Sequence, residues 1–195
     1  GLFALATPIV ALLFQHGAFT AHDTAMTALA LRLYLVGLPF AAVDLLLVYA
    51  FYARQDTLTS ALVGLVSLVL YMVVAVALFP RWGLFSLMIA DSVKHVLHAT
   101  VSAGLLARRL GGFGQQRLWT AIGKTGLAAG VMGAAALLVL PPLETLIGTD
   151  SLLREIALVG AAGGVSVAVF AALAALLRIE ELRWLAGLVR RRLGR

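Results

Sequence analysis

Apolar runs of about twenty residues recur along this chain, and each is long enough to cross the hydrocarbon core of a bilayer as a helix. Hydrophobic residues make up 62% of the 195 positions, and the mean hydropathy is +1.02. A typical soluble domain is only about 45–50% apolar. Lipid offers no water to satisfy an open strand edge, so we expect an all-α, polytopic integral membrane bundle.

We expect one partial span and five complete transmembrane spans. The partial span covers residues 1–14, and the complete spans cover about 24–52, 58–79, 83–107, 118–140 and 152–177. The chain starts inside an apolar run, and no basic segment precedes it as in a signal peptide. We therefore expect the C-terminal portion of a longer protein. The chain has no cysteine, which excludes disulfides and thiolate metal sites.

The Lys and Arg residues in the loops and near the span ends are distributed unequally between the two sides. One side carries only Arg81 and Arg154. The other side carries Arg54, Arg108, Arg109, Arg117, Lys124, Arg178, Arg183, Arg190, Arg191, Arg192 and Arg195. Basic residues favour cytoplasmic loops, so this second side, with the C-terminus, is expected in the cytoplasm.

The remaining connections are then expected to face outward. They are residues 15–24, a turn at 80–82 and a loop at 141–151. The three tryptophans, Trp82, Trp119 and Trp184, all fall at expected span ends, where interfacial aromatic residues gather.

Two polar breaks flank the span expected at 24–52, and their residues form recognisable motifs. The first break carries Gly17, Phe19, Thr20 and Asp23; the span carries Gly37 and Pro39; the second break carries Phe51, Tyr52, Asp56 and Thr57. This pattern, over residues 12–60, resembles the MurJ (MviN) family of lipid II flippases, within the MOP exporter superfamily. Ser60 stands where the family's second motif has a proline.

The resemblance implies a fold of fourteen helices, of which this chain would supply the end of the ninth through the fourteenth. It implies a transporter, not an enzyme, that moves an undecaprenyl-linked peptidoglycan precursor from the inner to the outer leaflet for cell wall synthesis. The expected partners are that precursor, membrane lipids and the protein's own N-terminal helices, in a bacterial inner membrane. The family's essential arginines lie in helices outside this chain, and no cofactor is expected.

The same resemblance suggests how the chain is divided. Residues 1–110 would belong to the second transporter lobe, residues 111–178 would form two additional helices, and residues 179–195 would form a basic cytoplasmic tail. The tail interleaves arginines with apolar residues, which is typical of a segment attracted to anionic lipid. Its position beside a span argues against nucleic-acid binding.

Four ionisable residues lie on one face of the span expected at 83–107, where the family usually has an apolar helix. They are Asp91, Lys94, His95 and His98, at positions i, i+3, i+4 and i+7. Charges inside a membrane are costly and often mark substrate or ion pathways. We expect Asp91 to reach Lys94 and His95, and Lys94 is spaced to meet His98. The face is either an ion- or substrate-responsive site or a self-neutralised patch that joins helices.

Two further ionisable residues lie in the span at 24–52. Asp44 shares a helix face with the small residue Gly37, and its candidate partners are Lys94, a histidine of the same span as Lys94, or a group outside this chain. Arg32 lies near the outer end of its span. It is expected to extend to the interface, and binding of a pyrophosphate or sugar carboxylate is the alternative.

Glycines are concentrated in the last two expected spans. Gly126 and Gly130, and likewise Gly160 and Gly164, have the GxxxG spacing that lets helix backbones approach closely in lipid. Ordinary helix pairing is the expected role. The resemblance adds a second possibility, because the family's last two helices border a groove suited to a lipid tail.

Three alternative functions remain open at this point. The chain could belong to another exporter of the same superfamily, for polysaccharide-linked lipids or drugs. It could be an intramembrane enzyme that uses Asp91, His95 and His98. These three could also supply metal ligands, but the ammonium of Lys94 on the same face opposes a bound cation. It could finally be a scaffold that kept the fold without transport.

Overall fold

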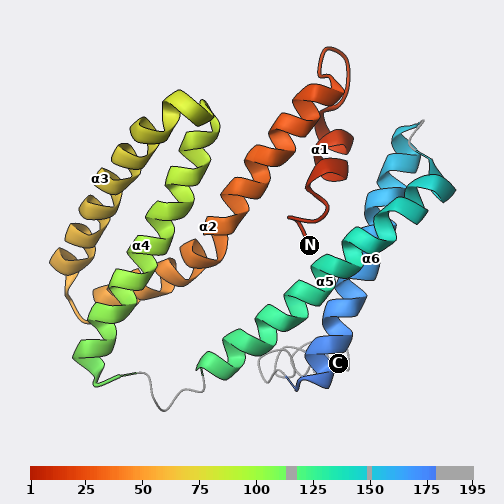
Figure 1. Ribbon diagram of the computed structural model, residues 1–195. Coiled ribbons are helices and arrows are strands. Elements are labelled where there is room, and N and C mark those ends of the chain that lie inside the picture. The colour runs from red at the N-terminus through yellow and green to blue at the C-terminus, as the bar shows by residue number, and fades with distance from the viewer. Residues whose placement is uncertain (113–117, 149–150, 179–195) are drawn as a thin grey trace, which may run out of the picture. The chain divides into compact units, whose positions relative to one another are not determined.

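The computed structural model describes residues 1–112, 118–148 and 151–178, and within these ranges the regular structure is entirely helical (Figure 1). The helices are α1 (Ala6–Phe14), α2 (Ala21–Ala53), α3 (Thr57–Trp82), α4 (Phe85–Leu110), α5 (Leu118–Ile147) and α6 (Leu152–Leu176). The prediction of an all-α bundle is confirmed. Each expected span corresponds to one helix, whereas the basic tail and Trp184 lie outside the described residues.

In the described part of the chain, four helices are long and apolar enough to cross a membrane: α2, α3, α5 from Thr120 onward, and α6. Helix α4 has the same length as α3, 26 residues, but it is not among the four. The physical reason is its polar face, because four ionisable residues and several serines replace apolar side chains there. The chain is therefore a multi-pass membrane protein, and the crossing of the bilayer by α4 stays a prediction.

The turn expected at 80–82 and the first part of the loop expected at 141–151 are helical in the structure, so the predicted ends of those two spans were wrong. Helix α3 continues through Pro80 to Trp82, and α5 continues through Pro141 and Pro142 to Ile147. Proline removes one backbone hydrogen bond, but helices of membrane proteins tolerate it where neighbouring groups satisfy the freed carbonyl. Gly83 and Gly148, both with positive φ, follow these two helices and allow the chain to turn.

The chain separates into two compact units. The first comprises residues 1–24 together with residues after 115, and the second comprises residues 25–114. The second unit contains most of α2 and the α3–α4 hairpin.

In the second unit, α2 and α4 run in the same direction and meet along their length. Ser92 Oγ donates a hydrogen bond of 2.7 Å to the carbonyl oxygen of Leu33, and further along Leu47 and Phe51 pack on Leu106. Gly37 allows this approach, because a Cβ at that position would lie 2.7 Å from the Cα of Ser92. The glycine of the GLP motif therefore has a packing role.

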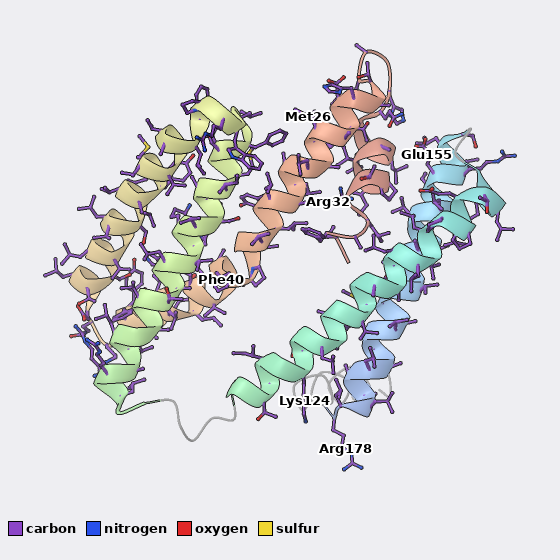
Figure 2. The ribbon with its side chains drawn as sticks, viewed as in Figure 1. Met26, Arg32, Phe40, Lys124, Glu155 and Arg178 are labelled. Carbon is purple, nitrogen blue, oxygen red and sulfur yellow. The ribbon has the colours of Figure 1, made fainter. Side chains whose placement is uncertain are left out.

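Helix α2 bends partway along its length (Figure 1), and Phe40 is labelled beside the bend (Figure 2). Pro39 lies at this point inside the helix. A proline lacks the N–H that would bond to the carbonyl four residues earlier, and its ring displaces that carbonyl, which accounts for the bend.

In the first unit, α5 and α6 form a hairpin that packs through alanines. Ala136 of α5 and Ala162 of α6 are fully buried and form one cluster with Ala4 and Leu5. The glycines of both helices contribute nothing to this packing. A Cβ at Gly123, Gly126, Gly130, Gly133, Gly160, Gly163 or Gly164 would meet no atom within 4 Å.

The GxxxG pairs therefore lie outside the alanine contact between α5 and α6, and their expected role in helix pairing stays a prediction. At 100° per residue, Gly126 and Gly130 lie on the side of α5 opposite Ala128, which is fully buried. Glycine spacing shows that a helix has a face without side chains, but it does not show which helix covers that face.

Candidate functional site

The polar face of α4 is built as two groups of contacts. In the first, Lys94 Nζ lies 2.5 Å from Asp91 Oδ1, and His95 Nε2 lies 3.6 Å from Asp91 Oδ2. The ammonium of Lys94 also lies 5.7 Å from the centroid of the Tyr71 ring on α3, within cation–π range. The expected contacts of Asp91 with Lys94 and His95 are confirmed.

The second group joins two helices. His98 on α4 forms a hydrogen bond through Nδ1 with Asp44 Oδ1 on α2. The side chains of Asp44 and His98 are only 15% and 10% exposed. Of the partners expected for Asp44, the structure selects His98. The expected meeting of Lys94 with His98 is not found among the described residues, because the ammonium turns toward Asp91 and Tyr71.

The position of the pair is set by the packing around it. Asp44 lies about 14 Å from the end of α2, and His98 about 18 Å from the end of α4, at a rise of 1.5 Å per residue. Gly37 and the hydrogen bond from Ser92 fix the two helices in contact nearer the other end. The pair is therefore deep within the helical bundle.

Sequence reasoning missed the serines of α4 and the aromatic residue beneath Lys94. Ser86, Ser92 and Ser102 are buried, and the hydroxyls of Ser86 and Ser102 have no hydrogen-bond partner among the described residues. The ring nitrogen Nδ1 of His95 is also buried and has no hydrogen-bond partner among the described residues. The available signal was the recurrence of serines along α4.

Arg32 lies half-buried on α2 (Figure 2), about 18 Å along the helix from Asp44. Its expected extension to the interface is not tested by any described contact. The structure thus joins Asp44 to the α4 residues and leaves Arg32 apart from them.

The motif residues of the first polar break form a helix cap. Thr20 N donates to Asp23 Oδ2 at 2.8 Å, and Asp23 N donates to Thr20 Oγ1 at 3.3 Å. This reciprocal arrangement is a capping box that satisfies free N–H groups at the start of α2. Gly17, with a φ of 62°, supplies the turn before the cap. Phe19 packs its ring 6.0 Å from that of Phe14.

The second polar break is also a cap, with an added ion pair. Asp56 accepts a hydrogen bond of 3.1 Å from Thr59 N at the start of α3, which begins at Thr57. The guanidinium of Arg109, from the end of α4, bonds to Asp56 and to Thr59 Oγ1 and lies over the buried ring of Phe51. Tyr52 is exposed. These motif residues fix helix ends, and the two caps by themselves form no substrate site.

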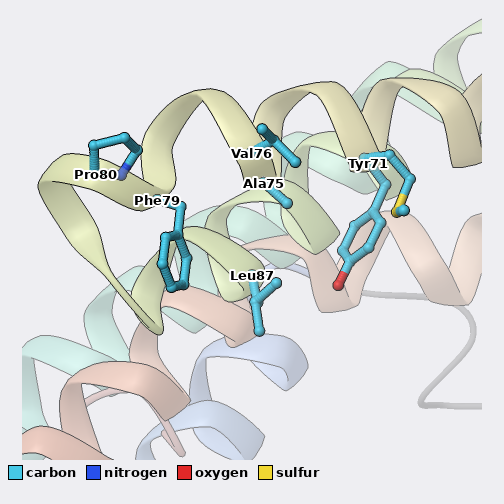
Figure 3. A pocket seen from close by; sticks show the side chains of 7 residues that line it. Tyr71, Ala75, Val76, Phe79, Pro80 and Leu87 are labelled. Atoms are coloured by element: carbon cyan, nitrogen blue, oxygen red, sulfur yellow. The ribbon is translucent and has the colours of Figure 1, made fainter.

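An apolar groove lies between α3 and α4 (Figure 3). It is lined by Tyr71, Met72, Ala75, Val76, Phe79, Pro80 and Leu87. The lining is apolar apart from one phenol hydroxyl, so the groove resembles the lipid-facing surface of a membrane protein.

Within the described ranges, no three His, Asp or Glu residues are grouped so as to hold a metal ion. Asp91 and His95 lie together, but the closest neighbour of Asp91 is the ammonium of Lys94, and the nearest partner of His98 is Asp44. These contacts do not fit the metal-dependent form of the enzyme alternative.

The fold and these contacts define a polytopic α-helical membrane protein with an ionisable cluster in its interior. A family model described as the lipid II flippase MurJ matches residues 1–158. The chain belongs to this family.

Curated relatives extend the match to nearly the whole chain. A probable lipid II flippase MurJ of Thermotoga maritima is 31% identical over 182 residues, which are 93% of this chain and 35% of that protein. The one of Vibrio cholerae is 28% identical over 186 residues, 94% of this chain and 35% of its own length. The one of Bdellovibrio bacteriovorus is 37% identical over 108 residues, 55% of this chain and 21% of its own length. The chain thus spans between about a fifth and a third of these relatives.

Proposed function

We propose that this chain is the C-terminal portion of a flippase that translocates an undecaprenyl-linked peptidoglycan precursor from the inner to the outer leaflet. The observation that carries the proposal is the family match over residues 1–158. The relatives named above are described as probable lipid II flippases. A transporter of this kind works by alternating access, in which helical lobes move around a site near the midplane.

Within that transporter, the α2–α4 unit would contribute part of one lobe. Its candidate pathway residues are Asp44, Asp91, Lys94, His95 and His98, and Arg32 is a candidate at the outer end. Support comes from their position, since ionisable groups inside the membrane are costly and are found mainly where they serve transport. The recognition of the precursor itself falls to helices outside this chain.

The proposed setting is the bacterial inner membrane with the C-terminus in the cytoplasm. The unequal distribution of Lys and Arg supports this orientation. The bond between Arg109 and Asp56 also supports this orientation, because it places Arg109 at the same end of the second unit as Arg54. The proposed partners are the precursor, membrane lipids and the remaining helices of the same protein.

Complementation tests the proposal. The full-length gene is expressed in a bacterium depleted of its own flippase, and growth, cell shape and membrane insertion are measured. Rescue is expected for the unaltered protein and for Thr100→Val, whose exposed hydroxyl bonds only within its own helix. Normal insertion without rescue would contradict lipid II flipping.

A transport assay separates the flippase from the other exporters of the superfamily. Purified full-length protein in vesicles should move labelled precursor across the bilayer, and a polysaccharide-linked lipid or a cationic drug should not compete. Preferential movement of either competitor would assign the protein to a different branch of the superfamily.

A further inference from the structure

The Asp44–His98 pair is distinct among the ionisable groups inside the second unit. Lys94 bonds to Asp91 on its own helix and His95 lies 3.6 Å from the same carboxylate, whereas His98 bonds to a carboxylate on a different helix. Any movement of α2 relative to α4 at this level must stretch or break the pair. A change in the charge of this pair would therefore change the packing of α2 against α4.

Among the described residues, the charges of this cluster do not balance unless a further positive charge is present. Asp44 and Asp91 contribute two carboxylates, and Lys94 contributes one ammonium. From α3 only the phenol of Tyr71 faces the cluster at Lys94, and Arg32 is about 18 Å away along α2. With both imidazoles neutral, the cluster carries one net negative charge in a medium of low dielectric constant, where an uncompensated charge is unfavourable.

A proton on His98 restores neutrality at the point where the charge is missing. The imidazolium then donates from Nδ1 to the carboxylate of Asp44. The other ring nitrogen, Nε2, faces α3 at Gly64, where even an added Cβ would remain 3.8 Å away. The glycine thus leaves room beside the nitrogen that exchanges the proton. Proton uptake forms one N–H bond at Nε2 and breaks one O–H bond of a hydronium ion, which leaves as water.

We propose that Asp44 and His98 form a proton-binding site that holds α2 and α4 together through an imidazolium–carboxylate pair when it is occupied, and only through a weaker neutral hydrogen bond when it is empty. Proton binding at the pair is independent of what the protein transports. Its use to couple helix movement to substrate translocation rests on the flippase function proposed above. Proton loading on one side of the membrane and release on the other would make a proton gradient a driving force.

The helix separation can be measured directly in the full-length protein. Nitroxide labels are placed on introduced cysteines at Tyr49 and Val101, exposed positions of α2 and α4, in a background without other cysteines. Distance distributions are recorded in lipid nanodiscs from pH 5 to pH 8.5. We expect the short-distance population to grow as the pH falls.

Three variants decide whether the pair causes this response. His98→Lys, which keeps a positive charge throughout, should hold the short distance at every pH. His98→Gln should lose the response, and His22→Gln, at an exposed position outside the second unit, should keep it. A response that persists in His98→Gln, or no response in the unaltered protein, would overturn the proposal.

A second measurement does not depend on the variants folding. Nitrogen-15 spectra of histidine-labelled full-length protein in bilayers distinguish neutral from cationic rings. We expect a cationic ring with a strong Nδ1 hydrogen bond under conditions in which the short distance dominates. A purely neutral interior histidine there would reject the site. Failed complementation with both spectroscopic results intact would reject the flippase function and leave the proton site standing.

Discussion

Two helix interfaces in this chain are packed in different ways. The α2–α4 interface, formed at Leu33, Gly37, Asp44, Ser92 and His98, combines one close backbone approach with a hydrogen bond and an ion pair. The α5–α6 interface is apolar at Ala136 and Ala162, and Ser166 bonds only to its own helix, at the carbonyl oxygen of Ala162. The first interface can respond to charge, whereas the second depends on shape alone.

The difference shows why similar small residues have different roles. Gly37 is indispensable to its contact because α4 lies directly against it. The glycines of α5 and α6 outnumber it, yet they face open space in the described part of the chain. Small residues allow two helices to pack closely, but they affect packing only where a partner helix lies against them.

The largest expected effect comes from breaking the ion pair on one side. His98→Ala leaves the Asp44 carboxylate without its partner inside the membrane, at a cost on the order of 2.5–3.5 kcal/mol. The melting temperature of the full-length protein in detergent should fall strongly. The double variant Asp44→Asn/His98→Gln retains a neutral hydrogen bond and should recover much of the loss. Equal loss in the double variant would show that packing, not charge, dominates.

The next effect compares glycines of the two interfaces. Gly37→Ala places a methyl group 2.7 Å from the Cα of Ser92 and should destabilise the protein by about 1–3 kcal/mol. Gly130→Ala is the matched control, because its Cβ would meet nothing and alanine favours a helix. Thermal unfolding of the two variants side by side provides the measurement. Comparable losses would mean that another part of the protein covers Gly130.

A smaller effect is expected where alanines close the α5–α6 hairpin. Ala162→Leu overfills the cluster with Ala136 and Leu5, and a cost of about 1 kcal/mol is expected because the short segment before α1 can shift. Gly160→Leu, on the other side of α6, serves as the comparison and should change the melting temperature little. A larger loss of stability in Gly160→Leu than in Ala162→Leu would show that the glycine face of α6 is its packing surface.

The smallest effect concerns the interhelical hydrogen bond. Ser92→Ala removes the donor to the Leu33 carbonyl oxygen, and such bonds in membrane proteins contribute about 0.6 kcal/mol on average. Melting should shift only slightly, and complementation should be retained. Ser67→Ala, which loses a bond within its own helix, is the matched control. A loss as large as that of His98→Ala would make Ser92 part of the charged site.

The candidate site was predictable wherever contacts run along one helix. The spacing of Asp91, Lys94 and His95 brings them together on α4 whatever surrounds that helix. The partner of Asp44 could only be narrowed to a few groups, because the register of α2 against α4 depends on Gly37 and Ser92 meeting. The role of Tyr71 beneath Lys94 was hidden for the same reason, since it comes from a third helix.

The helix ends show the same division. Thr20 and Asp23 are three residues apart, so their reciprocal cap is a local property of the sequence. Asp56 is also a local cap, but its bond to Arg109 joins residues that are 53 positions apart. The prolines at 80, 141 and 142 made the predicted ends of α3 and α5 too early. Proline usually ends a helix in a local prediction, but the packed bundle allows both helices to continue.

The sequence by itself determined that the protein is a helical membrane protein, because the length and hydropathy of its apolar runs leave no other stable solution in lipid. It also determined the family, through motifs that fix the ends of α2 and α3. Only the tertiary structure decided which small residues pack and which carboxylate pairs with His98. Those choices depend on the register between helices, which is set by many weak contacts summed over whole surfaces and not by any local pattern.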